Sequence, residues 1–545
     1  MLCKNKSLIV CIAAIFIAFG SYIVEATDNT ALPTEEIKVI GITPTSSSIG
    51  LPEDLIPYHV QSATSEDLER TQSLDLTDFM NRNLGSVHIN DAQNNPLQPD
   101  VQYRGFTASP LLGLPQGISI FQNGIRINEP FGDAINWDLL PVSAISSIDL
   151  IGGSNPLFGL NTLGGALSIT TKNGFTHPGH SFELYGGSFN RIVATINSGG
   201  NYGTWGYYFT ANYFDEEGWR DASPSNAINI FGSLNYRTDI STMDLDVSHG
   251  DTDLIGNGAI PIELNALKRE AVFTSPDQTV NDLYMINLQG SHWFSDTLQS
   301  SGNIFYRINN TDTFNGDISE FKECNIIDIS VDEILIEANE DNLGNAGLNC
   351  NTGFTEAQLE LVGGKVAEDQ NGNFIKNENA NGSERNAINN ISNREQEGFG
   401  GTLQATFLND LFSRNNQLIV GASYQQGLID FFQVTEIATL ACEFNGAGCT
   451  LPSADRGTIS TGLFAVEEGT RIKSHNRTWS MFLTDTINLT DKSALTVSAR
   501  YNNTHIVLGD RSIQSDLVTP EDPTSLNGEH DYQRINPAVG LTYEI

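Results

Sequence analysis

From Ser181 onward, apolar and polar side chains alternate in segments of about ten residues. In one such segment Trp205, Tyr207 and Phe209 alternate with Tyr208 and Thr210. A period of two is typical of a strand with one apolar and one polar face, and roughly twelve such segments predict as many strands. A soluble β-sandwich would show the same alternation, so the pattern alone predicts strands without fixing their surroundings.

The connections between these segments alternate between very short and very long. In an up-and-down barrel every second connection lies on the same rim, so this alternation gathers all the long loops on one side. The sequence therefore favours a transmembrane antiparallel β-barrel over a secreted sandwich, with the apolar strand faces toward lipid. Short links lie near 201–203, 238–239, 295–296, 409–416 and 490–491, and long ones near 215–225, 251–280, 310–395, 429–475 and 506–531.

Residues 56–174 precede the strand-rich region and have a mixed pattern. We expect a helix that begins at Thr64 or Ser65, with Asp67 completing a capping box, and a second helix from Leu74 to Leu84. Asn123-Gly124 lies between two β-rich arms and predicts a tight hairpin turn. The segment therefore predicts a compact α+β domain, which closes with two strands around a glycine-rich loop.

The first residues indicate export from the cytoplasm. Lys4 and Lys6 precede an apolar run from Leu8 to Phe19, which is shorter than the roughly 20 residues of a membrane helix. Residues 1–26 therefore predict a secretory signal peptide. Residues 27–55 are polar and predict a flexible segment with one short apolar island.

Four cysteines follow the predicted signal peptide. They form two local pairs, Cys324 with Cys350 and Cys442 with Cys449, and no histidine lies near either pair. In an oxidising compartment this spacing predicts two loop-closing disulfides rather than a metal site.

Composition and motifs argue against nucleic-acid binding and catalysis. The net charge of -38 excludes a basic footprint for nucleic acid. The chain has no HExxH, GxSxG or GxxxxGK motif, so we expect neither an enzyme nor a resident cofactor or metal. The run Asp369, Asn371, Asn373 and Glu378 is spaced like a calcium loop, but Phe374 stands where the turn would need glycine. A solvated acidic loop is the expectation there, with calcium binding as the alternative.

Several motifs together carry a resemblance to a known family. They are EIKVIGITP at 36–44, QPDVQYRGF at 98–106, the hairpin run that continues through NEPFGD to Asp133, and the glycine-rich run before Gly174. With these motifs the chain resembles the TonB-dependent receptors, in which an N-terminal plug domain fills a barrel of about 22 strands. The resemblance implies a plug in residues 56–174 and a partial barrel, with roughly 12 of those strands and long extracellular loops, in residues 175–545.

The resemblance also implies roles for particular residues. A TonB box near 36–42 would add as a strand to a sheet of TonB, and Arg104 would pair with acidic groups of the barrel wall or the plug. The TonB-binding residues would be Glu36, Ile37, Lys38, Val39, Ile40, Gly41 and Ile42. The structural residues of the plug would be Arg104, Gly105, Gly124, Gly152, Gly153, Gly164 and Gly165. The ligand-binding candidates are Phe106, Leu111, Leu112, Gln116, Phe131 and Trp137, although the apolar members of this set would equally suit a plain core.

The function implied by the resemblance is TonB-dependent uptake across the outer membrane of a Gram-negative bacterium. The partners would be TonB with its inner-membrane motor complex, outer-membrane lipid, and a ferric siderophore or another iron complex. Because the loops are acidic, a vitamin, a glycan or another metal complex stays open as ligand. A barrel that binds at the surface without transport, as an adhesin does, is the alternative from another class.

The last strand pattern stops at Ile545 in NPAVGLTYEI. Twelve strands enclose too narrow a lumen for a plug of this size, because barrel diameter grows with strand number. We therefore expect a fragment that lacks roughly ten strands.

Overall fold

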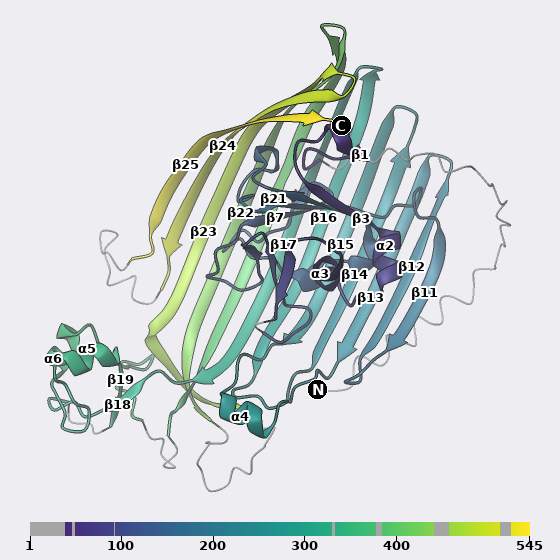
Figure 1. Ribbon diagram of the computed structural model, residues 1–545. Helices are drawn as coiled ribbons and strands as arrows, with labels where there is room; N and C mark the ends of the chain where they lie inside the picture. Colours follow the sequence, from purple (N-terminus) through teal and green to yellow (C-terminus); the bar gives the residue numbers. More distant parts are fainter. Residues whose placement is uncertain are drawn as a thin grey trace. The chain divides into compact units, whose positions relative to one another are not determined.

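Twelve antiparallel strands form the largest sheet of the computed structural model, which describes residues 39–45, 49–91, 93–329, 333–377, 384–440, 457–512 and 525–544 (Figure 1). Each strand pairs with the next one in chain order, as the alternating pattern predicted. The predicted signal peptide and the Cys442–Cys449 pair lie outside the described residues. The strands are β11 (Gly179–Gly186), β12 (Ile192–Tyr202), β13 (Trp205–Glu216), β14 (Ser225–Arg237), β15 (Ser241–Ile255), β16 (Asp277–Ser295), β17 (Leu298–Ile318), β21 (Ala387–Leu411), β22 (Arg414–Leu440), β23 (Thr458–Thr490), β24 (Ser493–Asp510) and β25 (Gly528–Tyr543).

In this sheet the polar face is buried and the apolar face is exposed, which is the opposite of a soluble β-sandwich. In β14 the polar side chains of Asn229, Ser233 and Asn235 are buried, whereas Leu234 is 48% exposed. In β13 the aromatic side chain of Trp205 is half exposed, and the same face carries other exposed aromatic residues. Polar groups therefore face the N-terminal domain and apolar groups face outward, which is the arrangement expected of strands in contact with lipid.

Short and long connections alternate along the sheet, as predicted. The short ones are 203–204, 238–240, 296–297, 412–413 and 491–492, and the long ones include 217–224, 256–276, 319–386 and 511–527. Strands late in the sheet are much longer than the predicted ten residues, since β22 has 27 and β23 has 33, whereas β11 has 8. Continued pairing satisfies the main-chain donors and acceptors of these extensions, so the loops begin later than the side-chain pattern suggested.

The N-terminal domain contains a five-stranded sheet in the order β3-β9-β10-β7-β8. A second sheet, in the order β4-β5-β6, carries the motif at 98–106. The first sheet consists of β3 (Val60–Thr64), β9 (Ile145–Gly152), β10 (Gly165–Thr171), β7 (Ile118–Gln122) and β8 (Ile125–Arg126), and the second of β4 (Val87–Asn90), β5 (Asp100–Tyr103) and β6 (Phe106–Ala108). Strands β9 and β10 are the antiparallel pair predicted around the glycine-rich loop.

Two helices lie beside these sheets. Helix α2 (Ser65–Thr71) is capped by Thr64, whose hydroxyl accepts from the Asp67 main chain while the Asp67 carboxylate accepts in return. This reciprocal cap confirms the predicted capping box. Helix α3 (Leu76–Asn83) begins after the N-cap Asp75, and short 3-10 turns complete the domain as η2 (Glu53–Leu55), η3 (Trp137–Leu139), η4 (Val142–Ala144) and η5 (Pro156–Phe158).

The core of this domain extends to the large sheet. Tyr103, Ile148 and Leu167 are almost fully buried in one apolar cluster, and Met285 of β16 belongs to the same cluster. The N-terminal domain is thus packed on the polar face of the large sheet, and the predicted combination of an α+β plug with an antiparallel transmembrane sheet is confirmed.

The loop after β17 is more ordered than its polar, acidic composition indicated. It contains a small sheet of β18 (Lys322–Cys324), β19 (Ile334–Glu337) and β20 (Lys365–Val366), with helices α5 (Glu340–Asn345) and α6 (Glu356–Leu361). Apolar side chains that are sparse along the sequence meet in one core, which includes Ile336, Phe354 and Leu359. A further short helix, α4 (Ile262–Leu267), lies in the loop before β16. Among the helices of the described residues, none is long and apolar enough to cross a membrane.

Candidate functional site

The predicted TonB box lies at one end of the plug, and its described part is docked. Strand β1 (Val39–Ile40) pairs with β2 (Leu51–Pro52), whereas Glu36, Ile37 and Lys38 lie outside the described residues. Val39 is 58% exposed, while Ile40 and Ile42 are buried. The expectation of a flexible segment therefore does not hold for residues 39–45 and 49–55, because their apolar side chains find a core.

That core joins the box to the large sheet. Ile40 and Ile42 share an apolar cluster with Leu157 of the plug and with Ile419 and Phe482 of the sheet. Beside this cluster, the Thr43 hydroxyl donates a 3.0 Å hydrogen bond to Gln404 Oε1 on β21. The docked strand is thus held by three partners: its own plug, β2 and the sheet.

Two different structural requirements explain why glycine stands at the predicted plug positions. Gly105, Gly124 and Gly153 have φ between 84° and 89°, the left-handed region that glycine enters without strain. Gly152, Gly164 and Gly165 lie where a Cβ atom would come within 2.4 to 2.6 Å of neighbouring atoms.

The hairpin tip at Asn123-Gly124 fastens the plug to the sheet. Both residues have positive φ, of 49° and 84°, as the predicted tight turn requires. The Asn123 amide donates to Asp246 Oδ2 on β15 at 2.9 Å and to the Thr171 hydroxyl at 2.7 Å. Asn123, which the sequence predicted as a turn residue, therefore also makes a contact between the plug and the sheet.

Arg104 does not make the ion pair that the resemblance implied. It is exposed in the turn between β5 and β6 with φ of 52°, and its guanidinium lies 5.1 Å from the centre of the Tyr103 ring. Within the described ranges, no carboxylate lies within salt-bridge distance of it. The turn aims this side chain along the plug surface rather than at a carboxylate.

Instead, the buried ion pair between plug and sheet joins Glu129 to Arg307 of β17. The two guanidinium nitrogens donate to the two carboxylate oxygens at 2.9 and 2.6 Å. The Glu129 side chain is fully buried and that of Arg307 is 9% exposed. Asn309 and Asn136 each donate a further hydrogen bond to the same carboxylate, at 2.9 and 3.0 Å. We call Glu129, Asn136, Arg307 and Asn309 the plug latch.

A second buried carboxylate, Asp138, lies near the latch. It accepts from the Thr252 hydroxyl at 2.6 Å and from the Asn281 amide at 2.9 Å, both on strands of the large sheet. Burial raises the pKa of Asp138 to about 6, and the negative charge of Glu129 acts in the same direction. Sequence reasoning missed both carboxylates, because only the NEPFGD run pointed to the region and it did not distinguish Glu129.

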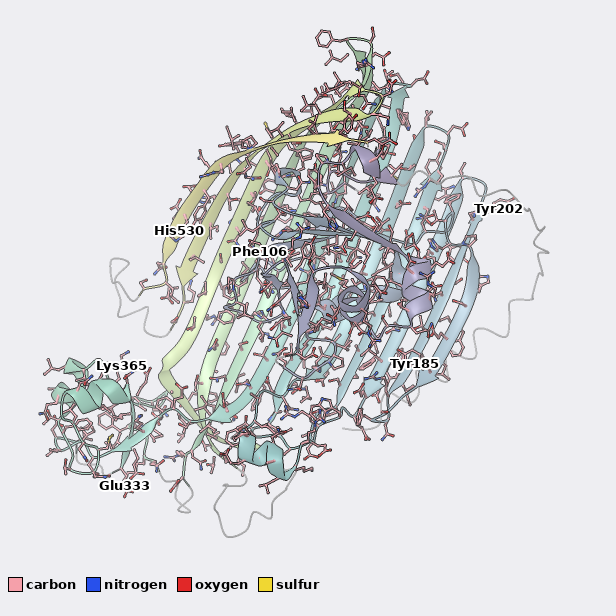
Figure 2. All side chains as sticks on the ribbon, in the orientation of Figure 1. Phe106, Tyr185, Tyr202, Glu333, Lys365 and His530 are labelled. Carbon is pink, nitrogen blue, oxygen red and sulfur yellow. A yellow bond between two sulfur atoms is a disulfide. The ribbon has the colours of Figure 1, made fainter. Side chains whose placement is uncertain are left out.

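The ligand-binding candidates divide into core and surface residues. Trp137 is 5% exposed and donates from its indole to the Ala108 carbonyl, and Gln116 is buried against Ser109. For these two candidates a role in the core explains the position. Phe106 is 37% exposed (Figure 2), and Leu111, Leu112 and Phe131 are half-buried.

Further apolar side chains are exposed on the plug. They are Leu114, Leu160 and Leu163, and Leu163 is 57% exposed next to Gly164, which packs against Phe106. We call Phe106, Leu114, Leu160 and Leu163 the apolar plug surface. Of this set only Phe106 was among the ligand-binding candidates, since the glycine-rich run that carries Leu160 and Leu163 predicted only a turn.

A polar cavity of about 330 Å³ separates part of the plug from strands β14 to β17. Its lining includes groups of both charges: Asn123, Lys172, Arg237, Asp244, Asp246 and Gln289. The plug is therefore held on the sheet by discrete contacts rather than by continuous apolar packing.

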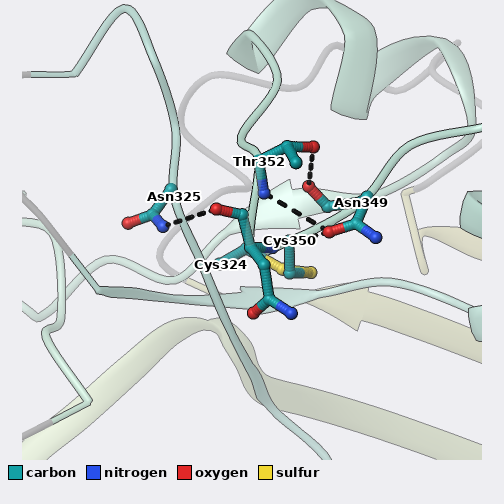
Figure 3. Close-up of a disulfide and its surroundings, with 6 residues drawn as sticks. Cys324, Asn325, Asn349, Cys350 and Thr352 are labelled. Atoms are coloured by element: carbon teal, nitrogen blue, oxygen red, sulfur yellow. Dashed lines mark hydrogen bonds between the residues drawn. A yellow bond between two sulfur atoms is a disulfide. The ribbon is translucent and has the colours of Figure 1, made fainter.

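Cys324, Cys350 and Asp369 all belong to the loop after β17. Cys324 and Cys350 form the predicted disulfide (Figure 3) within the small sheet β18–β20 and helices α5 and α6 of the loop after β17, which we call the loop module. The Asp369 carboxylate accepts from the main chains of Asn371 and Asn373, as in a turn. Among the described residues, the metal-type clusters of His, Cys, Asp and Glu do not include Asp369.

Comparisons with known proteins agree with this architecture. Residues 52–166 match the family model described as TonB-dependent Receptor Plug Domain. No curated protein sequence matches the chain significantly.

Solved structures with a similar fold include three named receptors. The unliganded ferric citrate transporter FecA has a TM-score of 0.61 at 12% identity, over 90% of this chain and 61% of that one. FpvAI in its complex with pyocin S2 has a TM-score of 0.62 at 14% identity, over 92% and 58%. The open form of the ferric-catecholate import receptor Fiu from E. coli K12 has a TM-score of 0.60 at 12% identity, over 92% and 69%. The chain spans about three fifths of the length of the first two.

Proposed function

We propose that the chain is a TonB-dependent receptor and that it imports a scarce ligand across the outer membrane of a Gram-negative bacterium. The match of residues 52–166 to the plug-domain family model and the fold shared with FecA support this proposal. Import is active and depends on contact with TonB, which transmits force from the inner-membrane motor complex. The protein makes and breaks no covalent bond in this role, and outer-membrane lipid surrounds the apolar face of its sheet.

The observation that carries the proposal is the docked strand β1. Residues 39–40 already have strand conformation, and Val39 is exposed while Ile40 is buried. A short β-strand whose main chain can change partners is what addition to a TonB sheet requires. Burial of the two isoleucines stabilises the docked form by about 1.5–3 kcal/mol each, so the strand stays with the plug until another contact changes.

The ligand in this proposal is a ferric siderophore or another iron complex. The support is the apolar plug surface, which offers van der Waals contact to an organic chelator, and the ferric ligands named for FecA and Fiu. The net charge of -38 disfavours strongly anionic complexes at low salt. A chelate with little net negative charge therefore suits this chain best.

The test is ligand uptake by cells that produce the full chain. Labelled iron chelates, vitamins and oligosaccharides are offered to the parent and to a variant that lacks residues 37–42. We expect one iron chelate to accumulate and the deletion to abolish its accumulation. Uptake that survives the deletion would contradict the role of the box.

Two point variants sharpen this test. Val39→Pro removes a main-chain donor from β1, whereas Val39→Thr keeps the donor and the β-branched shape. We expect uptake to fall strongly in the proline variant and to stay near the parent level in the threonine variant. Equal loss in both would indicate that the side chain, not the main chain, is recognised.

A further inference from the structure

A cluster of metal-ligating side chains lies on β24 and β25, away from the plug. His505 stands opposite Asp531 in the strand register, and Glu529 lies two residues before Asp531. His505 Nδ1 is 3.0 Å from an Asp531 oxygen, and Nε2 is 3.6 Å from a Glu529 oxygen. One ligand atom from each of the three residues lies within 4.8 Å of the others.

A second histidine lies on the adjacent strand β23. His475 pairs with Val507, so it stands one diagonal step from His505 on the same face of the sheet. Its Nε2 atom is buried and has no hydrogen-bond partner within the described residues. His475 is a neighbour of the cluster and not a member, because the group of ligand atoms within 4.8 Å of one another does not include it.

The cluster is on the face of the sheet opposite the plug. The neighbouring side chain of Arg500 points to the other face, where it donates to the Leu157 carbonyl. On the face of His505, the rings of Trp479 and Tyr501 lie 5.1 Å apart, closer to the short turns. In Figure 2 the labelled His530 marks the stretch of β25 that carries both carboxylates. The cluster is therefore separate from the proposed import path.

The chemistry of these side chains selects a class of cation. Imidazole nitrogen with carboxylate oxygen is the ligand set of Zn²⁺ and similar first-row divalent ions, whereas Ca²⁺ and Mg²⁺ prefer oxygen alone. Three protein ligands would leave an open position for water or for a fourth ligand. Two adjacent carboxylates on a chain with net charge -38 also gain from a divalent cation that neutralises them.

We propose that His505, Glu529 and Asp531 bind a first-row divalent transition-metal cation. The site ties strands β24 and β25 together at the end that carries the long loops. A protonated His505 held between two carboxylates would produce similar distances without a metal, and the experiment separates the two arrangements.

The test uses the purified full chain in detergent micelles, freed of metal with a chelator. Zn²⁺ binding is followed by titration calorimetry, and Co²⁺ binding by the visible absorption of its coordination sphere. Three variants are compared with the parent: His505→Ala, Asp531→Asn and, as the matched control, His180→Ala. His180 is an exposed strand histidine whose partner is the Ser198 hydroxyl rather than a carboxylate.

We expect one high-affinity site in the parent and in the control. Each of the two site variants should weaken binding by about tenfold or more, because each removes a ligand. Asp531→Asn preserves shape, so it reports on the site even if His505→Ala disturbs the edge of the sheet. Equal Zn²⁺ affinity in the parent and both site variants, or no binding by the parent, would overturn the proposal.

Discussion

Substitution of Glu129 by glutamine should release the plug from the sheet at modest denaturant. The change keeps the shape of the side chain and removes the charge that faces Arg307, whose side chain is only 9% exposed. A buried ion pair that loses one partner costs about 3–5 kcal/mol, because the other charge stays without water or counter-charge. Arg394 also interacts electrostatically with Glu129, which favours the upper part of that range.

The assay is equilibrium unfolding of the full chain in detergent micelles, followed by tryptophan fluorescence. Trp137 is buried in the plug and becomes exposed when the plug unfolds. The matched control is Arg82→Gln on helix α3, which removes an ion pair of the same 2.6 Å length to Asp78. Because the Arg82 side chain is 66% exposed, the control should cost about 0.5 kcal/mol or less.

A double variant tests whether the loss arises from the unpaired charge. Glu129→Gln combined with Arg307→Met removes both charges, so it should lose less stability than Glu129→Gln alone. The reasoning would be refuted if Glu129→Gln unfolded within about 1 kcal/mol of the parent, as an ordinary surface substitution does.

Three further changes have defined outcomes. Between pH 3.8 and about 6, the folded chain keeps a proton on Asp138 that the unfolded chain has lost, so the contribution of Asp138 to the free energy of unfolding falls by about 3 kcal/mol as pH rises through that window. Asp138→Asn should remove this pH dependence from the free energy of unfolding, and an unchanged dependence would contradict the assignment. Replacing Cys324 and Cys350 by serine opens a loop of 26 residues, which should destabilise the loop module by about 3 kcal/mol and speed its proteolysis while the plug stays protected. Equal rates of loop-module proteolysis in the parent and the variant would argue that the disulfide does not stabilise the module. Gly50→Ala places a Cβ in steric clash with the Ile40 carbonyl oxygen, whereas the control Gly258→Ala, outside the TonB box, meets no atom within 4 Å. Only the first should undock β1 and raise the affinity for purified TonB without ligand, and equal affinities would argue against steric undocking.

Local signals in the sequence predicted the elements well. Thr64 and Asp67 are three residues apart, and Asn123 and Gly124 are adjacent, so each pair defines its cap or turn without help from the rest of the chain. The alternation of Asn229 and Ser233 with Leu234 predicted a strand in the same way. The period alone does not tell which face is buried, but the alternating short and long connections predicted outward apolar faces, and the buried polar side chains of β14 agree with that.

The sequence did not predict contacts between residues that are far apart along the chain. Glu129 and Arg307 are 178 positions apart, and neither has a neighbour in sequence that marks it as paired. Ile40 belonged to the apolar island (residues 37–40) on a segment predicted to be flexible, because its partners Ile419 and Phe482 lie on strands far along the chain. The apolar core of the loop module was hidden for the same reason.

Dependence of import on the proton gradient is the most direct test of the proposed function. Cells that produce the full chain are given a radioactively labelled ferric siderophore, with and without an uncoupler that collapses the gradient. We predict that the siderophore still binds at the surface after collapse while its accumulation stops. Accumulation that continues at the same rate without the gradient would contradict TonB-driven import.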